Sequence, residues 1–511
     1  MSKPRSSDLK SKFSKLVRDV VSSSKFFYFS IVFFALECIW IAFSALYPQA
    51  FDENFHFGLI QVYSHYWLPF LSKQPPGTSQ YSALTRDPSY LYHYLMSFPY
   101  RFISLFTHSI DTKIIIIRLI DAALFTLGLF VFRKLFRKMG LSKGLINITI
   151  FLFVLIPIVP QLAAQVNYDD MLFLLVGWIL LETTKVIDDI KLKKLSFKSL
   201  MLLLGSCILT SIVKYAFLPI FFAITLYLAI YSYKRYGSDF REVYRELKKS
   251  YRSLSRVTRY ALIAFVLIAI GLFAQRDGYN LLKYHSFAPD CSQVLSVDAC
   301  KAYSPWYVDY QRHQLVEGHK AFITYGPLGY IFQWFYWMWY RLFFAVNGPA
   351  SNFYSYPPLP LPSFGAIILA VAGFVAVVRW WKRLIKSRYV AFLLTACGIY
   401  LLSLFVKSYA TYHYTAVLEN MNGRYLLPIL LPLGGIVGLA FSYSLKNRPV
   451  KKALATVLIA LLFIEGGGII TFIIRSDDTW YWPNSVVKRI NYDAQKLTRH
   501  TVVKIKLNNS D

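Results

Sequence analysis

The stretch FFYFSIVFFALECIWIAFSALY, residues 26–47, is the first part of the chain that is long and apolar enough to cross the hydrocarbon core of a bilayer. It is followed directly by PQAFDENFHF, residues 48–57. The apolar stretch predicts a membrane-spanning helix. The adjacent acids Asp52 and Glu53 would then lie where that helix reaches the membrane surface.

The composition of the whole chain also indicates a membrane protein. Of its 511 residues, 56% are hydrophobic and 16% are charged, against roughly 25% charged in soluble proteins. The mean hydropathy is +0.42. These values are typical of a polytopic membrane protein. The net charge of +29 does not indicate nucleic-acid binding, because Lys and Arg fall in short groups between the apolar segments.

Hydropathy and segment length predict an all-α polytopic membrane protein with about eleven transmembrane helices. The expected spans are 26–47, 114–132, 145–160, 171–187, 199–213, 216–233, 260–274, 364–380, 389–407, 425–443 and 453–474. We expect residues 1–474 to form one transmembrane domain and residues 475–511 to form a short outer tail.

The basic groups predict how these spans are oriented. With eleven crossings, every group falls on one side of the membrane, which is the cytoplasmic side by the positive-inside rule. The N-terminus is then cytoplasmic and the C-terminus outside. The first span is long and follows a polar, basic leader, so we expect a retained helix and no cleaved signal. The groups lie in residues 3–25, 133–143, 185–198, 234–259, 379–388 and 446–452.

Two long outer loops result, at 48–113 and 275–363. The first contains aromatic amphipathic stretches near 55–71 and 89–106, which we expect to be helices lying in the membrane interface. In the second, the apolar stretch 330–344 would break the charge pattern if it crossed, so it is expected to be interfacial or re-entrant. Cysteine placement adds one expectation. Cys291 and Cys300 face an oxidising side and can form a disulfide or remain free thiols, whereas Cys38, Cys207 and Cys397 lie in spans and are expected to pack.

Asp52 and Glu53 are the first candidates for chemistry. A carboxylate at a membrane surface can act as a general base toward a hydroxyl group, or it can bind a divalent cation. The alternative is a solvated loop that happens to be acidic. His56, three residues later, can be a metal ligand or a phosphate contact, or an ordinary interfacial histidine.

Three further places carry charge near the same face. Asp169 and Asp170 begin the fourth span and can form a site with Asp52, or can serve as helix caps. Lys214 lies among apolar residues between the fifth and sixth spans, as a functional group or as a snorkelling side chain. Arg118 and Asp121 are three residues apart in the second span, and we expect them to pair on one helix face.

The remaining candidates are cations and their neighbours. Arg424, in Gly423-Arg424-Tyr425-Leu426-Leu427-Pro428, offers a fork of donors suited to phosphate, or an interfacial anchor. Arg86, Tyr92 and His93 lie together in the first outer loop. No phosphate-binding glycine loop, dinucleotide fingerprint, H-E-x-x-H or C-x-x-C motif occurs. A reaction would therefore draw its energy from the substrate, with no bound nucleotide.

Three motifs in this order resemble the GT-C superfamily of membrane glycosyltransferases, which includes protein O-mannosyltransferases and aminoarabinose transferases. The motifs are D-E-x-x-H-F at residues 52–57, N-x-D at residues 167–169 and G-R-Y-L-x-P at residues 423–428. The resemblance extends over nearly the whole chain through motif order and topology. One departure concerns the first outer loop, where Arg86-Asp87-Pro88 stands in place of Lys-Pro-Pro.

The resemblance implies an inverting transferase that uses a polyprenyl-phosphate-linked sugar. Asp52, with Glu53 beside it, would take a proton from the acceptor, while Lys214, Arg424 or Arg86 stabilises the leaving phosphate. His93 and Tyr92 would contribute to substrate binding, and Asp169 would orient the acceptor. Some relatives use a divalent metal, so Mg²⁺ or Mn²⁺ at Asp52, Asp169 and His56 is a further expectation.

The acceptor can be a polysaccharide, a lipid or a protein, and membrane lipids are expected partners. The resemblance also implies the plasma membrane of a bacterium. Two other functions remain open: a transporter or lipid flippase of the cell envelope, whose charges would lie near the midplane, and a non-catalytic scaffold of envelope assembly.

Overall fold

The computed structural model describes residues 6–468, 470–483 and 485–507, and within them it is built of helices without strands, apart from two isolated β-bridges. Eight helices of this part are long and apolar enough to cross a membrane. This confirms the prediction of an all-helical polytopic membrane protein. The eight are α2 (Ser24–Ser44), α5 (Ile110–Lys138), α10 (Leu218–Tyr236), α12 (Arg256–Phe273), α18 (Pro360–Arg379), α20 (Arg388–Thr415), α21 (Leu427–Ser444) and α22 (Pro449–Gly466).

Three more helices coincide with the other predicted spans: α6 (Lys143–Val154), α8 (Tyr168–Lys191) and α9 (Phe197–Val213). Helices α6 and α9 are apolar but short, and α8 is long but carries several charges. The predicted span 145–160 is interrupted, because Pro157 lacks the amide that would continue α6. The chain resumes as α7 (Ile158–Ala163). The count of eleven crossings depends on these three helices and stays a prediction.

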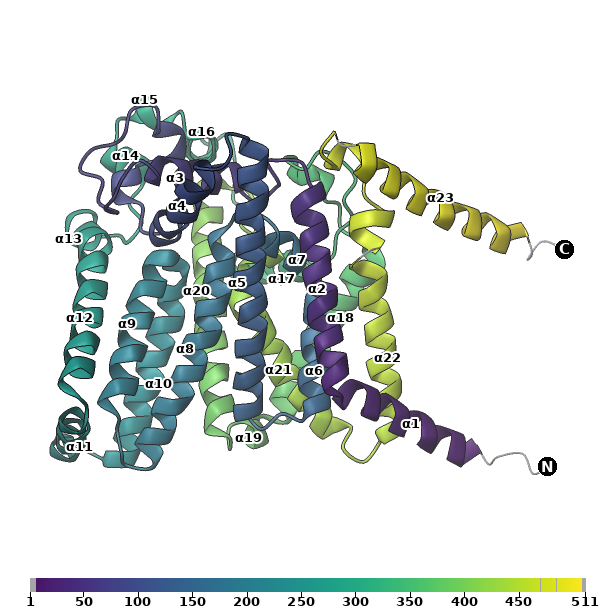
Figure 1. Cartoon of the computed structure of the whole chain (residues 1–511), viewed down its shortest axis with the longest axis horizontal. Coiled ribbons are helices and arrows are strands. Elements are labelled where there is room, and N and C mark those ends of the chain that lie inside the picture. Colours follow the sequence, from purple (N-terminus) through teal and green to yellow (C-terminus); the bar gives the residue numbers. More distant parts are fainter. Residues whose placement is uncertain (1–5, 469, 484, 508–511) are drawn as a thin grey trace.

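Helices α5 and α8 pack side by side along the bundle and carry several site residues (Figure 1). The helices approach closely because small residues face large ones. A Cβ atom on Gly128 would come within 2.6 Å of the Phe173 ring. Phe173 also stacks on Phe125 with ring centroids 4.0 Å apart. This contact fixes the register of the first turn of α8 against α5, so the acids of both helices are held at defined positions.

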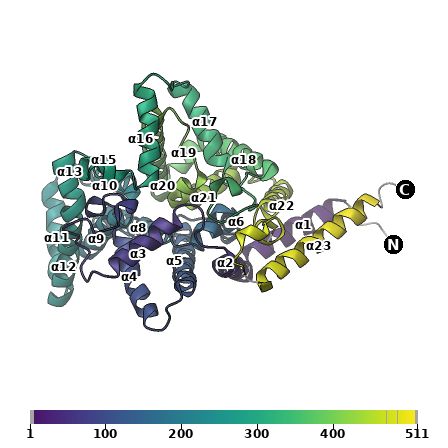
Figure 2. The same cartoon turned by 90° about the horizontal axis from the view of Figure 1, so that it is seen from above.

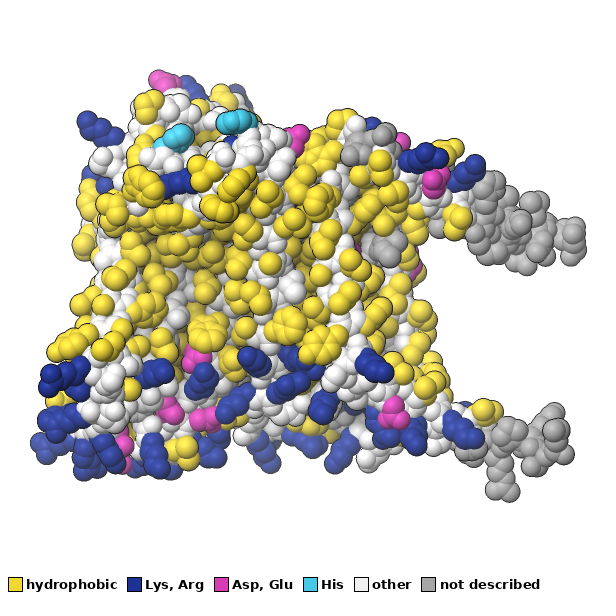
Figure 3. All heavy atoms as spheres, in the orientation of Figure 1, with side chains coloured by type: hydrophobic (Ala, Val, Ile, Leu, Met, Phe, Trp, Pro, Cys, Tyr) yellow, Lys and Arg dark blue, Asp and Glu magenta, His cyan; other side chains and the backbone are white. Residues whose placement is uncertain are grey.

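The two ends of the bundle differ in charge. Lys and Arg gather at one end, below a broad hydrophobic band (Figure 3). We call this the basic end; it includes Lys138, Lys234 and Lys386, and the helices α1 (Ser6–Ser22), α11 (Phe240–Ser253) and α19 (Trp381–Leu384) lie there. The opposite end, which we call the site end, is covered by α3 (Glu53–Tyr63), α4 (Leu91–Ser104), α14 (Cys291–Val294), α15 (Val297–Cys300) and α16 (Ser304–Glu317).

The predicted interfacial helices 55–71 and 89–106 correspond to α3 and α4, which pack against each other across the site end (Figure 2). Helix α3 ends earlier than expected, at Tyr63, and an irregular segment with Pro69, Pro75 and Pro76 follows. The stretch 330–344 forms most of α17 (Pro327–Tyr340). At about 1.5 Å per residue, this helix is too short to cross about 30 Å of hydrocarbon.

The second long loop and the C-terminal segment are both tied down. A disulfide joins Cys291 to Cys300 between α14 and α15, and α13 (Tyr279–Tyr284) precedes them. The segment after residue 474 returns to the end of α2, where the amide of Trp482 donates to the carbonyl oxygen of Ser44. Helix α23 (Ser485–Leu507) follows and, like α3, lies at the site end. The predicted boundary at 474 is therefore crossed by contacts with the bundle.

Candidate functional site

Asp52 stands at the entrance to α3 with its side chain turned outward. Both Phe51 and Asp52 have left-handed backbone conformations, with φ of 69° and 75°. This turn brings the chain from α2 into α3 and leaves the Asp52 side chain 54% exposed. Its Oδ2 atom lies 3.0 Å from Nη2 of Arg424. The ion pair joins two segments that are 372 residues apart.

Arg424 belongs to a short 3₁₀ turn, η6 (Gly423–Leu426), that leads into α21. Its backbone amide donates to Oδ1 of Asn422, and its Nη2 atom also lies 3.2 Å from the Tyr425 hydroxyl. Gly423 is required here, since a Cβ atom would overlap the Leu342 side chain and lie 3.1 Å from the Met338 carbonyl oxygen. Close packing thus fixes the backbone of this turn, from which the Arg424 side chain reaches Asp52.

A second ion pair lies beside the first. Nζ of Lys214 is 2.6 Å from Oδ1 of Asp169, and both side chains are largely buried. Lys214 connects α9 to the turn η3 (Tyr215–Phe217), and its ammonium lies 4.2 Å from the centre of the Tyr168 ring. The alternative role of Asp169 and Asp170 as helix caps is not what the structure shows, because Asn167 caps α8 by accepting from the Asp169 amide.

Tyr168 and His56 connect the two ion pairs. Their rings are 4.3 Å apart between centroids. Burial lowers the pKa of the His56 imidazole, and the positive charges of Lys214 and Arg424 lower it further. His56 is therefore neutral near pH 7 and adds no charge. We call Asp52, Asp169, Lys214 and Arg424 the charge cluster.

Glu53 has a different environment from its neighbour Asp52. Its side chain is fully buried and binds Arg118 through two hydrogen bonds of 2.7 Å. The same carboxylate accepts from the amides of Gln49 and Val166. Arg118 in turn donates to the carbonyl oxygens of Ala42 and Ala45. This network joins the end of α2 to α3, α5 and the start of α8, and it gives Glu53 a structural role.

The predicted pairing of Arg118 with Asp121 is therefore wrong. Arg118 binds Glu53, which the tertiary fold brings closer, and Oδ2 of Asp121 accepts from the Tyr92 hydroxyl at 2.7 Å. Asp170, also fully buried, lies near Asp121 with neither carboxylate oxygen hydrogen-bonded within the described residues.

The other predicted binding residues have protein partners as well. Nδ1 of His56 and Nε2 of His93 share a 2.9 Å hydrogen bond, and burial lowers the pKa of His93 too. The Tyr92 hydroxyl donates its hydrogen bond to Asp121. Arg86 stacks its guanidinium 3.9 Å from the centre of the Tyr279 ring. Their roles toward a substrate stay predictions, and the charge cluster does not depend on them.

The predicted metal ligands Asp52, Asp169 and His56 have protein partners in this arrangement, and a metal at these residues stays a prediction. Asp52 and Asp169 are each bound to a cation of the protein, and one ring nitrogen of His56 is bound to His93. Among the described residues, no three His, Cys, Asp or Glu side chains gather as possible ligands. We therefore derive no step through a metal.

A buried charged group beneath the segment 48–113 was missed from sequence. Arg276 is fully buried and donates to the Tyr63 hydroxyl at 2.9 Å and to the Pro69 carbonyl oxygen at 2.8 Å. Its guanidinium also lies 3.9 Å from the centre of the Tyr90 ring. Next to it, Asp277 is buried with neither oxygen hydrogen-bonded within the described part of the chain. An Arg-Asp pair at the end of an apolar helix was the available signal, because intramembrane charges are rare and usually functional.

No known protein family and no curated protein matches this chain.

Proposed function

We propose that this chain is a membrane glycosyltransferase that moves a sugar from a polyprenyl-phosphate-linked donor to an acceptor hydroxyl group. The observation that carries the proposal is the exposed Asp52 carboxylate held 3.0 Å from the Arg424 guanidinium, with the Lys214–Asp169 pair alongside. A general base and phosphate-binding cations are the groups that such a transfer needs. In this proposal the site end faces outward and the N-terminus is cytoplasmic, in the plasma membrane of a bacterium.

The chemistry follows from the charges. Asp52 accepts the proton of the acceptor hydroxyl as its oxygen attacks the anomeric carbon from the face opposite the phosphate. The bond between that carbon and the phosphate oxygen breaks, and the configuration inverts. Negative charge grows on the departing polyprenyl phosphate. Arg424, whose fork can bind phosphate through two donors, and Lys214 stabilise this charge.

The Asp52–Arg424 pair has a further consequence for this reaction. While the pair is intact, the guanidinium of Arg424 occupies one oxygen of the Asp52 carboxylate. Binding of the donor phosphate would draw Arg424 toward the phosphate and release Asp52. Both oxygens of Asp52 would then be open to the acceptor hydroxyl only when the donor is present, which disfavours reaction without substrate.

The test is release of free polyprenyl phosphate by the purified chain in nanodiscs, supplied with a panel of polyprenyl-phosphate sugars and candidate acceptors. We expect release with one donor class and a loss of about 10²–10⁴-fold in Asp52→Asn, the usual contribution of a general base. Asp298→Asn is the matched control, because Asp298 is an exposed acid at the same end in α15. Equal release by wild type and Asp52→Asn would remove Asp52 from the mechanism.

A second candidate, a transporter or lipid flippase, is favoured by one observation. Helix α22 stops at Gly466 and the chain resumes as a π turn, η7 (Ile470–Ile474), while α6 stops at Val154 before α7. These interruptions touch, because a Cβ on Gly467 would overlap the Leu155 carbonyl oxygen. Interrupted helices occur at transport sites. Translocation of a labelled lipid in proteoliposomes that persists in Asp52→Asn would favour this candidate.

A further inference from the structure

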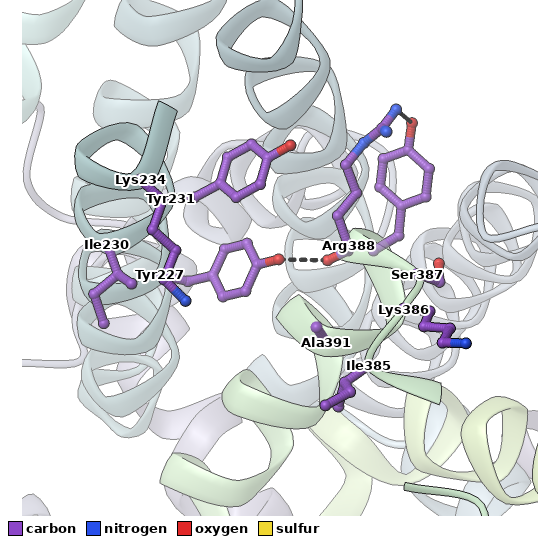
Figure 4. Close-up of a pocket in the computed structure, with 10 residues that line it drawn as sticks. Tyr227, Ile230, Tyr231, Lys234, Ile385, Lys386, Ser387, Arg388 and Ala391 are labelled. Carbon is purple, nitrogen blue, oxygen red and sulfur yellow. Dashed lines mark hydrogen bonds between the residues drawn. The ribbon is translucent and has the colours of Figure 1, made fainter. Parts of the chain in front are cut away.

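A cavity of about 560 Å³ opens at the basic end, far from the charge cluster along the bundle. It lies between the last turns of α10 and the first turn of α20 (Figure 4). Ten residues line it: Tyr227, Ile230, Tyr231, Lys234, Ile385, Lys386, Ser387, Arg388, Tyr389 and Ala391. Three of them are cations and none is an acid.

The positive charge of this cavity is only partly balanced. Nη2 of Arg388 binds Oδ1 of Asp188 at 2.6 Å, but Oδ2 of the same carboxylate also binds Lys138 at 2.6 Å. Two cations thus share one carboxylate. Within the described residues, no carboxylate oxygen lies within 4 Å of the ammonium of Lys234 or Lys386. A bound anion would balance the positive charge that the carboxylate of Asp188 leaves uncompensated.

The backbone adds to this preference. Helix α20 begins in the cavity wall, and its N-cap residue Ser387 makes no side-chain capping bond. The first amides of a helix are free donors at the positive end of its dipole, which favours an anion. The Tyr227 hydroxyl donates to the Arg388 carbonyl oxygen at 2.7 Å and so fixes α10 against this turn. The ring of Tyr231 stacks parallel to that of Tyr227, and its hydroxyl points toward the gap beside Arg388 (Figure 4).

Two aliphatic side chains that line the cavity are exposed. Ile230 of α10 is 48% exposed, and Ile385, which precedes α20, is 41% exposed. A ligand of this cavity therefore meets both cations and exposed aliphatic side chains. A soluble anion would use only the first of these features, whereas a membrane phospholipid would use both.

We propose that this cavity binds the phosphate headgroup of an anionic phospholipid from the leaflet at the basic end. Lys234 and Lys386 lie on opposite sides of the start of α20 and attract the headgroup from either side (Figure 4). The first turn of α20 donates to its phosphate, and the acyl chains run along Ile230 and Ile385. Basic pockets between membrane helices are known to hold anionic headgroups in this way. The site is independent of the reaction proposed above.

The test is native mass spectrometry of the full chain in detergent, titrated with dioleoyl phosphatidylglycerol or dioleoyl phosphatidylcholine. We expect one tightly bound phosphatidylglycerol per chain and a clear preference over phosphatidylcholine. The double variant Lys234→Gln/Lys386→Gln should lose about 30-fold in affinity, since each lysine near an anionic headgroup contributes about fivefold. The charge-preserving variant Lys234→Arg/Lys386→Arg should recover most of it.

Two controls separate this site from general charge and from free anions. Lys446→Gln/Lys451→Gln removes two exposed lysines elsewhere at the same end and should leave the affinity unchanged. Inorganic phosphate at millimolar concentration should not displace the lipid. Equal loss in both glutamine variants, equal binding of the two lipids, or displacement by inorganic phosphate would each overturn the proposal.

Discussion

Asp52 and Glu53 are neighbours in the chain, yet the left-handed turn at residues 51 and 52 sends their side chains to opposite environments. Asp52 is half exposed beside Arg424, whereas Glu53 is fully buried with Arg118 and two backbone amides. Because the ion pair is buried and both carboxylate oxygens of Glu53 are hydrogen-bonded, it holds the connected segments in fixed positions. Loss of one partner leaves the other charge without compensation.

Glu53→Gln should therefore destabilise the protein strongly. We expect a loss of about 3–5 kcal/mol, because Arg118 would remain buried without its counter-charge. Thermal unfolding of the purified chain in detergent measures it. The control is Glu465→Gln, which breaks a partly exposed ion pair with Arg475 and should cost about 1 kcal/mol or less. Similar melting temperatures for Glu53→Gln and wild type would contradict the structural role of Glu53.

The His56–His93 pair predicts a dependence of stability on pH. Burial lowers the pKa of both rings, so the folded chain keeps them neutral where the unfolded chain would bind protons. Below the usual value of about 6.5, the unfolded state binds more protons, and stability falls as the pH falls. Melting temperatures between pH 8 and pH 5 should show this decline.

The matched variants for that measurement are His56→Gln/His93→Gln and His319→Gln. The double variant should start less stable but should lose part of the decline, since the two buried rings no longer contribute to proton uptake. His319 is exposed, so its replacement should leave the decline as in wild type. If the melting temperature of the double variant depended on pH as that of the wild type does, the two histidines would not be the cause of the decline.

At this scale, the sequence indicated which charged residues lie near one another more readily than which of them form ion pairs. The motifs placed Asp52, Asp169, Lys214 and Arg424 on one face, and the structure brings them together. The pairings were harder, because an ion pair such as Asp52–Arg424 joins residues 372 positions apart. For Arg118, the local rule for helix neighbours favoured Asp121, and a tertiary contact with Glu53 prevailed.

At the scale of elements, apolar length predicted the long helices well, since a membrane requires it. It could not locate interruptions and short surface helices with the same accuracy. The break after α6 depends on Pro157, and α3 ends where tertiary contacts replace helix continuation. Helix α16 was not predicted at all, because its sequence is polar and aromatic without a clear apolar face.

The docking of α16 should respond to pH. Burial, together with the nearby charge of Glu419, raises the pKa of Asp309 to about 6. Arg312 of the same helix pairs with Glu419, which precedes the Arg424 motif, and lies 3.6 Å from Asp309. A carboxyl group whose pKa is raised in the folded state stabilises that state when protonated, and this contribution is lost as the pH rises through about 6.

Hydrogen exchange of α16, corrected for intrinsic rates, should therefore be slower at pH 5 than at pH 7.5. Asp309→Asn should slow exchange at pH 7.5 and remove most of the difference, because it mimics the protonated state. Asp298→Asn, at the same end of the molecule, should behave as wild type. Faster exchange at pH 5 than at pH 7.5 would reverse the sign and reject the assignment.

At the scale of the whole molecule, the basic groups predicted a chain with two unlike ends, and Figure 3 shows Lys and Arg gathered at one of them. This worked because orientation in a membrane depends on summed charge, which sequence gives directly. Which end faces the cytoplasm is a separate question, and the positive-inside rule predicts the basic end. The glycosyltransferase proposal needs this orientation, since it has the site end facing outward.

Single-cysteine labelling in intact cells tests the orientation. Gln311→Cys lies in α16 at the site end and Lys249→Cys in α11 at the basic end, and both positions are exposed. An impermeant maleimide should label Gln311→Cys at once and Lys249→Cys only after the cells are permeabilised, with a difference of about tenfold or more in initial rate, since the bilayer excludes the charged reagent. The background should be low, because Cys38, Cys207 and Cys397 are buried and Cys291 is bound to Cys300. The reverse pattern would place the charge cluster in the cytoplasm and remove the basis for an outward-facing transferase.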